Sequence, residues 1–172
     1  MIDLKRILLP TDFSKYSQVA LEYAAALADK FGAEIHLLHV TQNLAVFIPD
    51  MVNVMPPVGP SPEQMASAVK AAFDRLIQEQ KLDRFKVVTE SREGTPFYEI
   101  IQYGKDKAVD LIVMGTHGHS GLAHVLMGSV TEKVVRKAPC PVLTVRQVPA
   151  PQAVTVSRSA RISQFDTVPG LG

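Results

Sequence analysis

The sequence has little cysteine and no strong excess of either charge. Its single cysteine, Cys140, excludes an intrachain disulfide, and the apolar run that follows it favours a small buried side chain over a reactive thiol. The 172 residues include 18 Lys and Arg against 17 Asp and Glu, for a net charge of +1. A nucleic acid or an anionic membrane is therefore not expected as a partner.

Long hydrophobic runs are also missing. No uncharged apolar stretch approaches the ~18 to 20 residues that a membrane helix requires. Charges at Asp3, Lys5 and Arg6 interrupt the start of the chain, so no secretory signal is expected there. With 47% hydrophobic and 20% charged residues, the composition is ordinary for a globular domain, and we expect a cytoplasmic protein.

Five apolar runs alternate with four segments of helical periodicity. The expected strands cover 6–10, 33–40, 85–90, 110–115 and 140–146. Ser14 and Gly32 are expected to cap the first helix, and "SPEQ" at 61–64 is a start signal for the second. Strands that alternate with helices predict an α/β fold, in which a parallel sheet has helices on both faces. The run 110–115 is the most apolar, and we expect it to be central.

The helical periodicity also predicts which residues face the core. In chain order these are Tyr16, Ala20, Tyr23, Ala24, Leu27 and Phe31; then Met65, Val69, Ala72, Leu76 and Ile77; then Phe97, Ile100 and Ile101; and finally Met127, Val130, Val134, Val135 and Ala138. In the second strand, His36 and His39 differ in parity. We therefore expect one of them to face the core and to form a backbone hydrogen bond.

Ligands of parallel α/β sheets bind beyond the carboxyl ends of the strands, where the strand order reverses. This rule selects "PTD" after the first strand, Val40 at the end of the second, and "GTHGHSGLAHVLMGSV" at 115–130 after the fourth. Three interpretations of the last stretch compete: a loop that holds phosphate, a histidine metal site, and a glycine-rich turn without a ligand.

The glycine spacing suits a di- or triphosphate. Gly115 lets the chain turn off the strand end, and Gly118 lets backbone amides approach a bound group. Gly128 and Ser129 open the fourth helix, whose unpaired N–H groups favour an anion, and the hydroxyls of Ser129 and Thr131 add donors. The stretch is not a P-loop, because GK[ST] is missing, and it lacks the G-x-G-x-x-G dinucleotide fingerprint. A plain structural turn is the alternative.

The histidines of this stretch are His117, His119 and His124. They would need a tight loop to converge on a metal, and the loop has no carboxylate or cysteine to complete the shell. A dedicated metal site is therefore the less favoured interpretation.

Asp12 favours a nucleotide as the ligand. A carboxylate just beyond the first strand can accept hydrogen bonds from ribose hydroxyls or from an adenine amine. Its alternative role is that of an N-cap or Asx-turn residue at the start of the first helix. Val40 can flank a base, or it can simply be a buried strand end.

Three motifs in this order resemble the universal stress protein family. They are "ILLPTDFS" at 7–14, the pattern Gly115-x2-Gly118-x9-Gly128-Ser129, and "APCPVLTV" at 138–145. The likeness covers residues 1–146, which leaves 147–172 as a C-terminal extension that we expect to be extended or mobile. The resemblance implies a Rossmann-like three-layer α/β/α domain with a five-stranded parallel sheet of order 3-2-1-4-5. It also implies a homodimer formed through the fifth strand, Cys140 to Arg146.

The same resemblance implies a ligand and its site. The glycine pattern is that of the ATP-binding branch, in which a divalent metal, Mg²⁺ or Mn²⁺, would bridge the phosphates. Residues carried over from the family are Pro10, Thr11, Asp12 and Val40 around the adenosine, Met114, Gly115, His117 and Gly118 along the loop, and Gly128, Ser129, Val130 and Thr131 at the phosphates.

The expected function is that of an ATP-binding module in stress response or signalling, acting as a homodimer. One alternative is a nucleotide-free dimeric interaction module, and another is a slow ATPase. Efficient turnover is not expected, because no lysine lies between 108 and 132 to neutralise charge on the γ-phosphate. The connection 41–60 has no assigned role.

Overall fold

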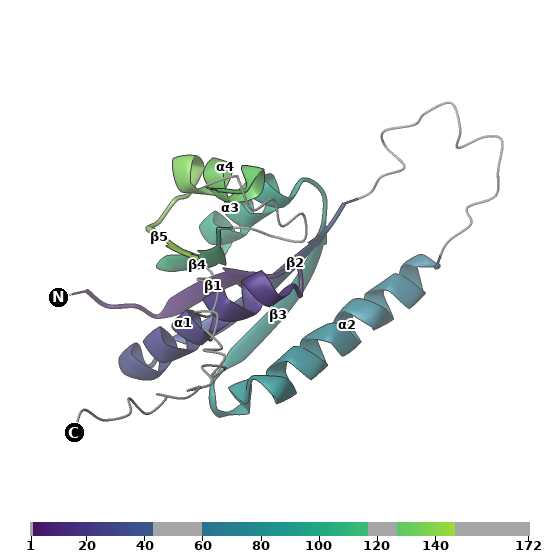
Figure 1. Ribbon diagram of the computed structural model, residues 1–172, viewed down its shortest axis with the longest axis horizontal. Helices are drawn as coiled ribbons and strands as arrows, with labels where there is room; N and C mark the ends of the chain where they lie inside the picture. Colours follow the sequence, from purple (N-terminus) through teal and green to yellow (C-terminus); the bar gives the residue numbers. More distant parts are fainter. Residues whose placement is uncertain (1, 43–59, 117–126, 147–172) are drawn as a thin grey trace, which may run out of the picture.

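The computed structural model describes residues 2–42, 60–116 and 127–146. Its elements are, in chain order, β1 (Arg6–Pro10), α1 (Lys15–Phe31), β2 (Glu34–Thr41), α2 (Pro62–Glu79), the 3₁₀ helix η2 (Leu82–Arg84), β3 (Val87–Glu93), α3 (Pro96–Asp106), β4 (Leu111–Gly115), α4 (Ser129–Lys137) and β5 (Val142–Val145). The strands are parallel and their order is β3-β2-β1-β4-β5 (Figure 1). The predicted fold class and strand order are confirmed.

The sheet separates two hydrophobic cores. Ile7 and Leu9 of β1 pack with residues of α1 and α2, whereas Leu8 packs with residues of α3 and α4, and all three are 0% exposed. Figure 1 shows α1 and α2 on one side of the sheet and α3 and α4 on the other. Because successive side chains of a strand point to opposite faces, a strand covered on both sides must be apolar throughout.

The predicted helix boundaries have the expected capping bonds. At the start of α1, Ser17 N–H donates to Ser14 Oγ at 3.4 Å. At the start of α2, Gln64 N–H donates to Ser61 Oγ at 3.3 Å, and Ser61 N–H donates to Gln64 Oε1 at 2.8 Å. Gly32 ends α1 in the left-handed conformation, with a φ of 67°, which glycine adopts without strain.

Several sequence predictions about burial are wrong. Tyr23, Met65 and Val135 were expected to face the core, but they are 53%, 41% and 45% exposed. Periodicity gives the direction of a side chain on its helix, but not whether the sheet extends beneath it. The first turns of α2 project beyond the sheet in Figure 1, so Met65 has little to pack against. Phe73, two turns later, is 4% exposed, although it was not among the residues predicted to face the core.

The expectation that 110–115 forms the central strand is also wrong. β1 is central, and β4 lies between β1 and the edge strand β5. Both strands are covered on both faces, so the hydrophobicity of their side chains does not distinguish their places in the sheet. The third strand also begins and ends later than predicted, since its pairing with β2 continues to Glu93 opposite Thr41.

One histidine of β2 was expected both to face the core and to form a backbone hydrogen bond, but the structure gives these two roles to different histidines. His36 is buried, and its Nδ1 lies 2.7 Å from Tyr103 Oη while its Nε2 lies 3.0 Å from Glu34 Oε1. His39 is the histidine that forms the backbone bond, between its Nδ1 and Thr11 O at 2.9 Å. Hydrogen bonds from Lys86 and then from His36 lower the pKa of Glu34 to about 2, and burial raises the pKa of Tyr103 to about 12.

Among the residues that the structure describes, no helix has the length and apolar character needed to cross a membrane.

Candidate functional site

A cavity of about 440 Å³ lies at the carboxyl ends of β1, β2 and β4, where the strand order reverses. Its walls include every predicted site residue that the structure describes: Pro10, Thr11, Asp12, Val40, Met114, Gly115, Gly128, Ser129, Val130 and Thr131. The remaining two, His117 and Gly118, lie outside the described residues, as do His119 and His124. The structure thus brings the turn after β1, the end of β2 and the start of α4 together around one cavity.

Sequence reasoning missed five residues of the cavity wall, namely Ser17, Leu38, Gln42, Pro96 and Ile100. Leu38 and Gln42 have the parity of Val40, so the alternation of β2 could have placed them on the same face. Pro96 and Ile100 lie one turn apart on α3. No signal in the sequence indicates that this helix begins beside the cavity, because that follows from the packing of α3 on the sheet.

The turn between β1 and α1 is held by a directional chain of hydrogen bonds. Phe13 N–H donates to Thr11 Oγ1 at 3.0 Å, and Thr11 Oγ1 lies 3.1 Å from Ser17 Oγ. Because the Ser17 hydroxyl donates to Ser14 O at 2.8 Å, Thr11 must be the donor to Ser17. The hydrogens of both hydroxyls therefore stabilise the turn. Thr11 can offer a ligand only acceptor capacity and its methyl group.

Asp12 lies in the middle of this turn and on the wall of the cavity. Its Oδ1 accepts a hydrogen bond from Ser14 N–H at 3.0 Å, which is the Asx turn that the sequence offered as an alternative role. The two roles are compatible, since a carboxylate has about four lone-pair sites and this bond occupies one of them. The Asx turn fixes the carboxylate without exhausting its capacity to accept.

The start of α4 is anchored to the end of β4. Gly128 N–H donates to Thr116 O at 2.7 Å, and the Thr131 hydroxyl donates to Gly115 O at 2.9 Å. Thr131 is 4% exposed, so this bond fixes its hydroxyl inside the wall. Ser129, two residues earlier, is exposed. Of the two hydroxyls predicted to face phosphate, only that of Ser129 is therefore placed to reach a ligand.

The N-terminus of α4 presents backbone donors to the cavity. Ser129, Val130 and Thr131 are its first three residues, and no side chain of the described residues caps it. The first N–H groups of a helix have no partner within the helix, and the helix dipole places partial positive charge there. This wall therefore favours an anion.

The described wall of the cavity has little charge. Asp12 is the one ionisable side chain among the described lining residues, and no lysine or arginine accompanies it. In the described part of the chain, no group of three or more His, Cys, Asp or Glu is arranged to hold a metal ion. The described wall can accept hydrogen bonds at Asp12 and donate backbone N–H groups at the start of α4.

The fifth strand lies at a free edge of the described sheet. β5 pairs with β4 on one side, and the other side has no strand among the described residues. Leu143 of this strand is 36% exposed and Val135 of the adjacent α4 is 45% exposed. Cys140, just before the strand, is half-buried, and burial raises the pKa of its thiol.

Comparison with known proteins gives a consistent result. The model of the universal stress protein family matches residues 3–146. Universal stress protein MJ0531 of Methanocaldococcus jannaschii is 36% identical over 151 residues, which cover 83% of this chain and 82% of that protein. The solved structure of MJ0577 from the same organism aligns with a TM-score of 0.72 at 32% identity, covering 87% of this chain and 100% of that chain.

Two more distant solved structures share the fold. One is a universal stress protein in complex with cAMP, with a TM-score of 0.57 at 21% identity over 84% of this chain and 98% of that one. The other is a protein of the family from Arabidopsis thaliana with AMP bound, with a TM-score of 0.54 at 18% identity over 84% of this chain and 93% of that one. At these identities the likeness shows the fold alone.

Proposed function

The chain belongs to the universal stress protein family, and on that premise we propose that its cavity binds an adenine nucleotide, with ATP as the ligand. The observation that carries the proposal is a single cavity lined both by Asp12 and by the first turn of α4, which no side chain of the described residues caps. A carboxylate suits the sugar and base of a nucleotide, and a helix N-terminus suits its phosphates. Bound cAMP and AMP in two proteins of this fold support the choice of adenine.

The cavity suits a nucleotide in size and in wall chemistry. Its volume of about 440 Å³ lies within the range of roughly 300 to 1,000 Å³ that is typical of small-molecule sites. Leu38, Val40 and Ile100 provide apolar surface for a base, while Asp12 and the start of α4 provide polar groups. We place the adenosine beside Asp12 and Val40, and the phosphates at Ser129 and its neighbours.

A divalent metal is part of the proposal. The described wall has no lysine or arginine, so backbone dipoles and one hydroxyl would have to balance several phosphate charges. Mg²⁺ binds through phosphate oxygens and waters and needs few protein ligands, which suits a wall without an acidic cluster. The metal, Mg²⁺ or Mn²⁺, would therefore arrive bound to the nucleotide and would bridge its phosphates.

We further propose that the protein acts as a homodimer in stress response or signalling. The free edge of β5 and the exposed Leu143 beside it support pairing with a second copy. Nucleotide would act by binding one conformational or oligomeric state better than another. Slow hydrolysis is compatible with this role. Efficient turnover is not part of the proposal, because no lysine or arginine accompanies Asp12 among the described lining residues.

Isothermal titration with Mg-ATP can test the Asp12 wall and the α4 wall of the cavity separately. Asp12→Asn keeps an oxygen that can accept from Ser14 N–H but removes the charge, and it should weaken binding about tenfold or more. Asp29→Asn is the control: Asp29 is 65% exposed and lies near Gly32 and Arg84, away from the cavity. Asp29→Asn removes the same charge as Asp12→Asn and should leave the affinity for Mg-ATP unchanged.

The α4 wall can be tested by removing one backbone donor. Ser129→Ala removes the hydroxyl, whereas Ser129→Pro removes the hydroxyl and the N–H. Proline is tolerated at the first position of a helix, and Gly128, with φ of −67° and ψ of 151°, already has the conformation that proline imposes on its predecessor. Ser129→Pro should bind Mg-ATP more weakly than Ser129→Ala. Wild-type protein that shows neither heat nor a thermal shift at millimolar Mg-ATP would reject the proposed function.

A further inference from the structure

Phe13 has a backbone conformation that bulky residues rarely adopt. Its φ is 61°, in the left-handed region, where the Cβ atom of an L-residue crowds the backbone and bulky residues are rare. Lys81 and Ala108 also have positive φ, but each follows the end of a helix, where a left-handed residue is common. Phe13 instead precedes Ser14, the residue that caps the start of α1. The hydrogen bonds of Phe13 N–H to Thr11 Oγ1 and of Ser14 N–H to Asp12 Oδ1 support the turn from within, and contacts of the Phe13 ring add to them from outside.

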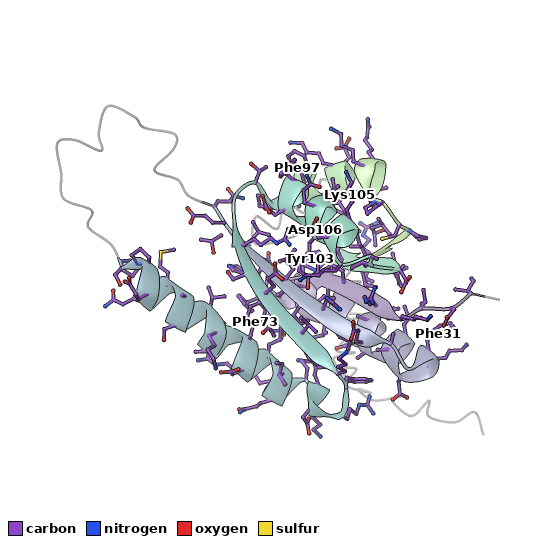
Figure 2. The ribbon with its side chains drawn as sticks, turned by 180° about the vertical axis from the view of Figure 1, so that it is seen from behind. Phe31, Phe73, Phe97, Tyr103, Lys105 and Asp106 are labelled. Carbon is purple, nitrogen blue, oxygen red and sulfur yellow. The ribbon has the colours of Figure 1, made fainter. Side chains whose placement is uncertain are left out.

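Side chains from two other elements hold the Phe13 ring. The ring centroid lies 4.8 Å from that of His39 in β2 and 5.2 Å from that of Phe73 in α2, which meets it edge-on. Phe73 is 4% exposed and points from α2 toward the sheet in Figure 2. Aromatic pairs at these separations are attractive beyond the area that they bury. The ring is thus clamped between β2 and α2.

His39 contacts the residues on both sides of Asp12, Thr11 and Phe13. His39 Nδ1–H donates to the carbonyl of Thr11 at 2.9 Å, and the His39 ring packs on the residue after Asp12. The Asp12 carboxylate lines the cavity, whereas the Phe13 ring packs against the core shared by α1 and α2. The left-handed turn at Phe13 is what allows consecutive side chains to serve these two places while Asp12 Oδ1 accepts from Ser14 N–H.

We propose that Phe13 is the positioning residue of the nucleotide site: its ring, clamped by His39 and Phe73, holds the left-handed backbone that presents the Asp12 carboxylate to the ligand. The inference rests on the proposed function. Without the ring, the backbone at position 13 relaxes toward negative φ, and the carboxylate leaves its place at the cavity wall.

Two substitutions in the full-length chain separate the backbone from the ring. Phe13→Ala loses the clamp and still disfavours positive φ, whereas Phe13→Gly loses the clamp but adopts positive φ freely. The left-handed preference of glycine over alanine corresponds to roughly fivefold to thirtyfold in the turn equilibrium. In titrations with Mg-ATP, Phe13→Ala should weaken binding about tenfold, and Phe13→Gly should recover at least about threefold of that loss.

A control variant separates positioning from general destabilisation. Phe85 is another partly buried aromatic residue of the same core, and it lies near Glu34 and Lys86 at the amino ends of the strands. Phe85→Ala should lower the urea midpoint but leave the affinity for Mg-ATP unchanged. Phe73→Leu keeps most of the buried volume and removes the edge contact, and it should weaken binding about threefold.

A double-mutant cycle with Asp12→Ala decides the proposal. Because Phe13 acts through Asp12, Phe13→Ala should change the affinity less than twofold in the Asp12→Ala background. An equal loss with and without the Asp12 carboxylate would overturn the positioning role, as would a Phe13→Gly variant that binds no tighter than Phe13→Ala. In both cases tight binding by the wild type would leave the proposed function intact, whereas a wild type without affinity overturns both.

Discussion

Replacing Tyr103 by phenylalanine should lower the free energy of unfolding by about 1 to 3 kcal/mol, because it leaves a buried imidazole nitrogen without its partner. Tyr103 is 0% exposed and His36 is 4% exposed, and their hydroxyl and Nδ1 atoms lie 2.7 Å apart. Glu34 has a pKa of about 2 and is ionised near neutral pH, so it can only accept from His36 Nε2–H. In the neutral imidazole, Nδ1 is then the acceptor and Tyr103 is the donor. The variant removes this donor and supplies no water in its place.

Urea denaturation at pH 8 measures this loss, and the melting temperature should fall by roughly 4 to 8 °C for about 2 kcal/mol in a domain of this size. The ring of Tyr103 and the Arg92 guanidinium 4.9 Å above it are retained, so packing changes little. Tyr98→Phe is the matched control: Tyr98 is 52% exposed, and its hydroxyl accepts from Gln102 Nε2 at 2.9 Å. Water replaces that bond, and the expected change is below about 0.5 kcal/mol. Equal losses of unfolding free energy in Tyr103→Phe and Tyr98→Phe would refute the view that Tyr103 donates a stabilising hydrogen bond to His36 Nδ1.

Three further measurements follow from the structure. Folding lowers the pKa of Glu34 from 4.5 to about 2, so the stabilisation that its ionised carboxylate provides is complete above pH 4.5 and is lost as the pH falls from about 4.5 to about 2. The free energy of unfolding of Glu34→Gln should therefore depend less on pH in that window than that of the wild type. The same pH dependence in both proteins would contradict this. Gly32 has a φ of 67° and no described atom within 4 Å of an added Cβ, so Gly32→Ala should cost about 1 kcal/mol in urea through backbone strain alone. Burial and then the charge of Asp110 raise the pKa of the Cys140 thiol; its reaction with a thiol reagent at pH 8 should be slower in the native protein than in urea, and equal rates would show an accessible thiolate.

The arrangement of the sheet could be predicted only in part from the residues. Alternation of apolar runs with amphipathic segments predicts a parallel sheet, because parallel strands need long crossover connections, which are usually helices. The strand order came from resemblance to a family. Hydrophobicity alone favoured 110–115 as the central strand, since strands buried on both faces have similar compositions. Exposure at Met65 depends on where the sheet ends beneath α2, which is a tertiary property.

The candidate site was more predictable than the burial of single residues. Asp12 follows β1, Val40 lies near the end of β2 and Gly115 ends β4, and in a parallel sheet these carboxyl ends meet at one edge. The left-handed backbone at Phe13 was not predictable, because a phenylalanine gives no local signal for positive φ. It depends on rings from β2 and α2 that are distant in sequence.

A crystal structure of the protein grown with Mg-ATP would show whether the cavity beyond β1, β2 and β4 holds the nucleotide. We expect a nucleotide with its adenosine beside Asp12 and Val40 and its phosphates within hydrogen-bonding distance of the backbone N–H groups at the start of α4. A cavity that stays empty at millimolar Mg-ATP, or a nucleotide whose phosphates lie at Asp12, would contradict it.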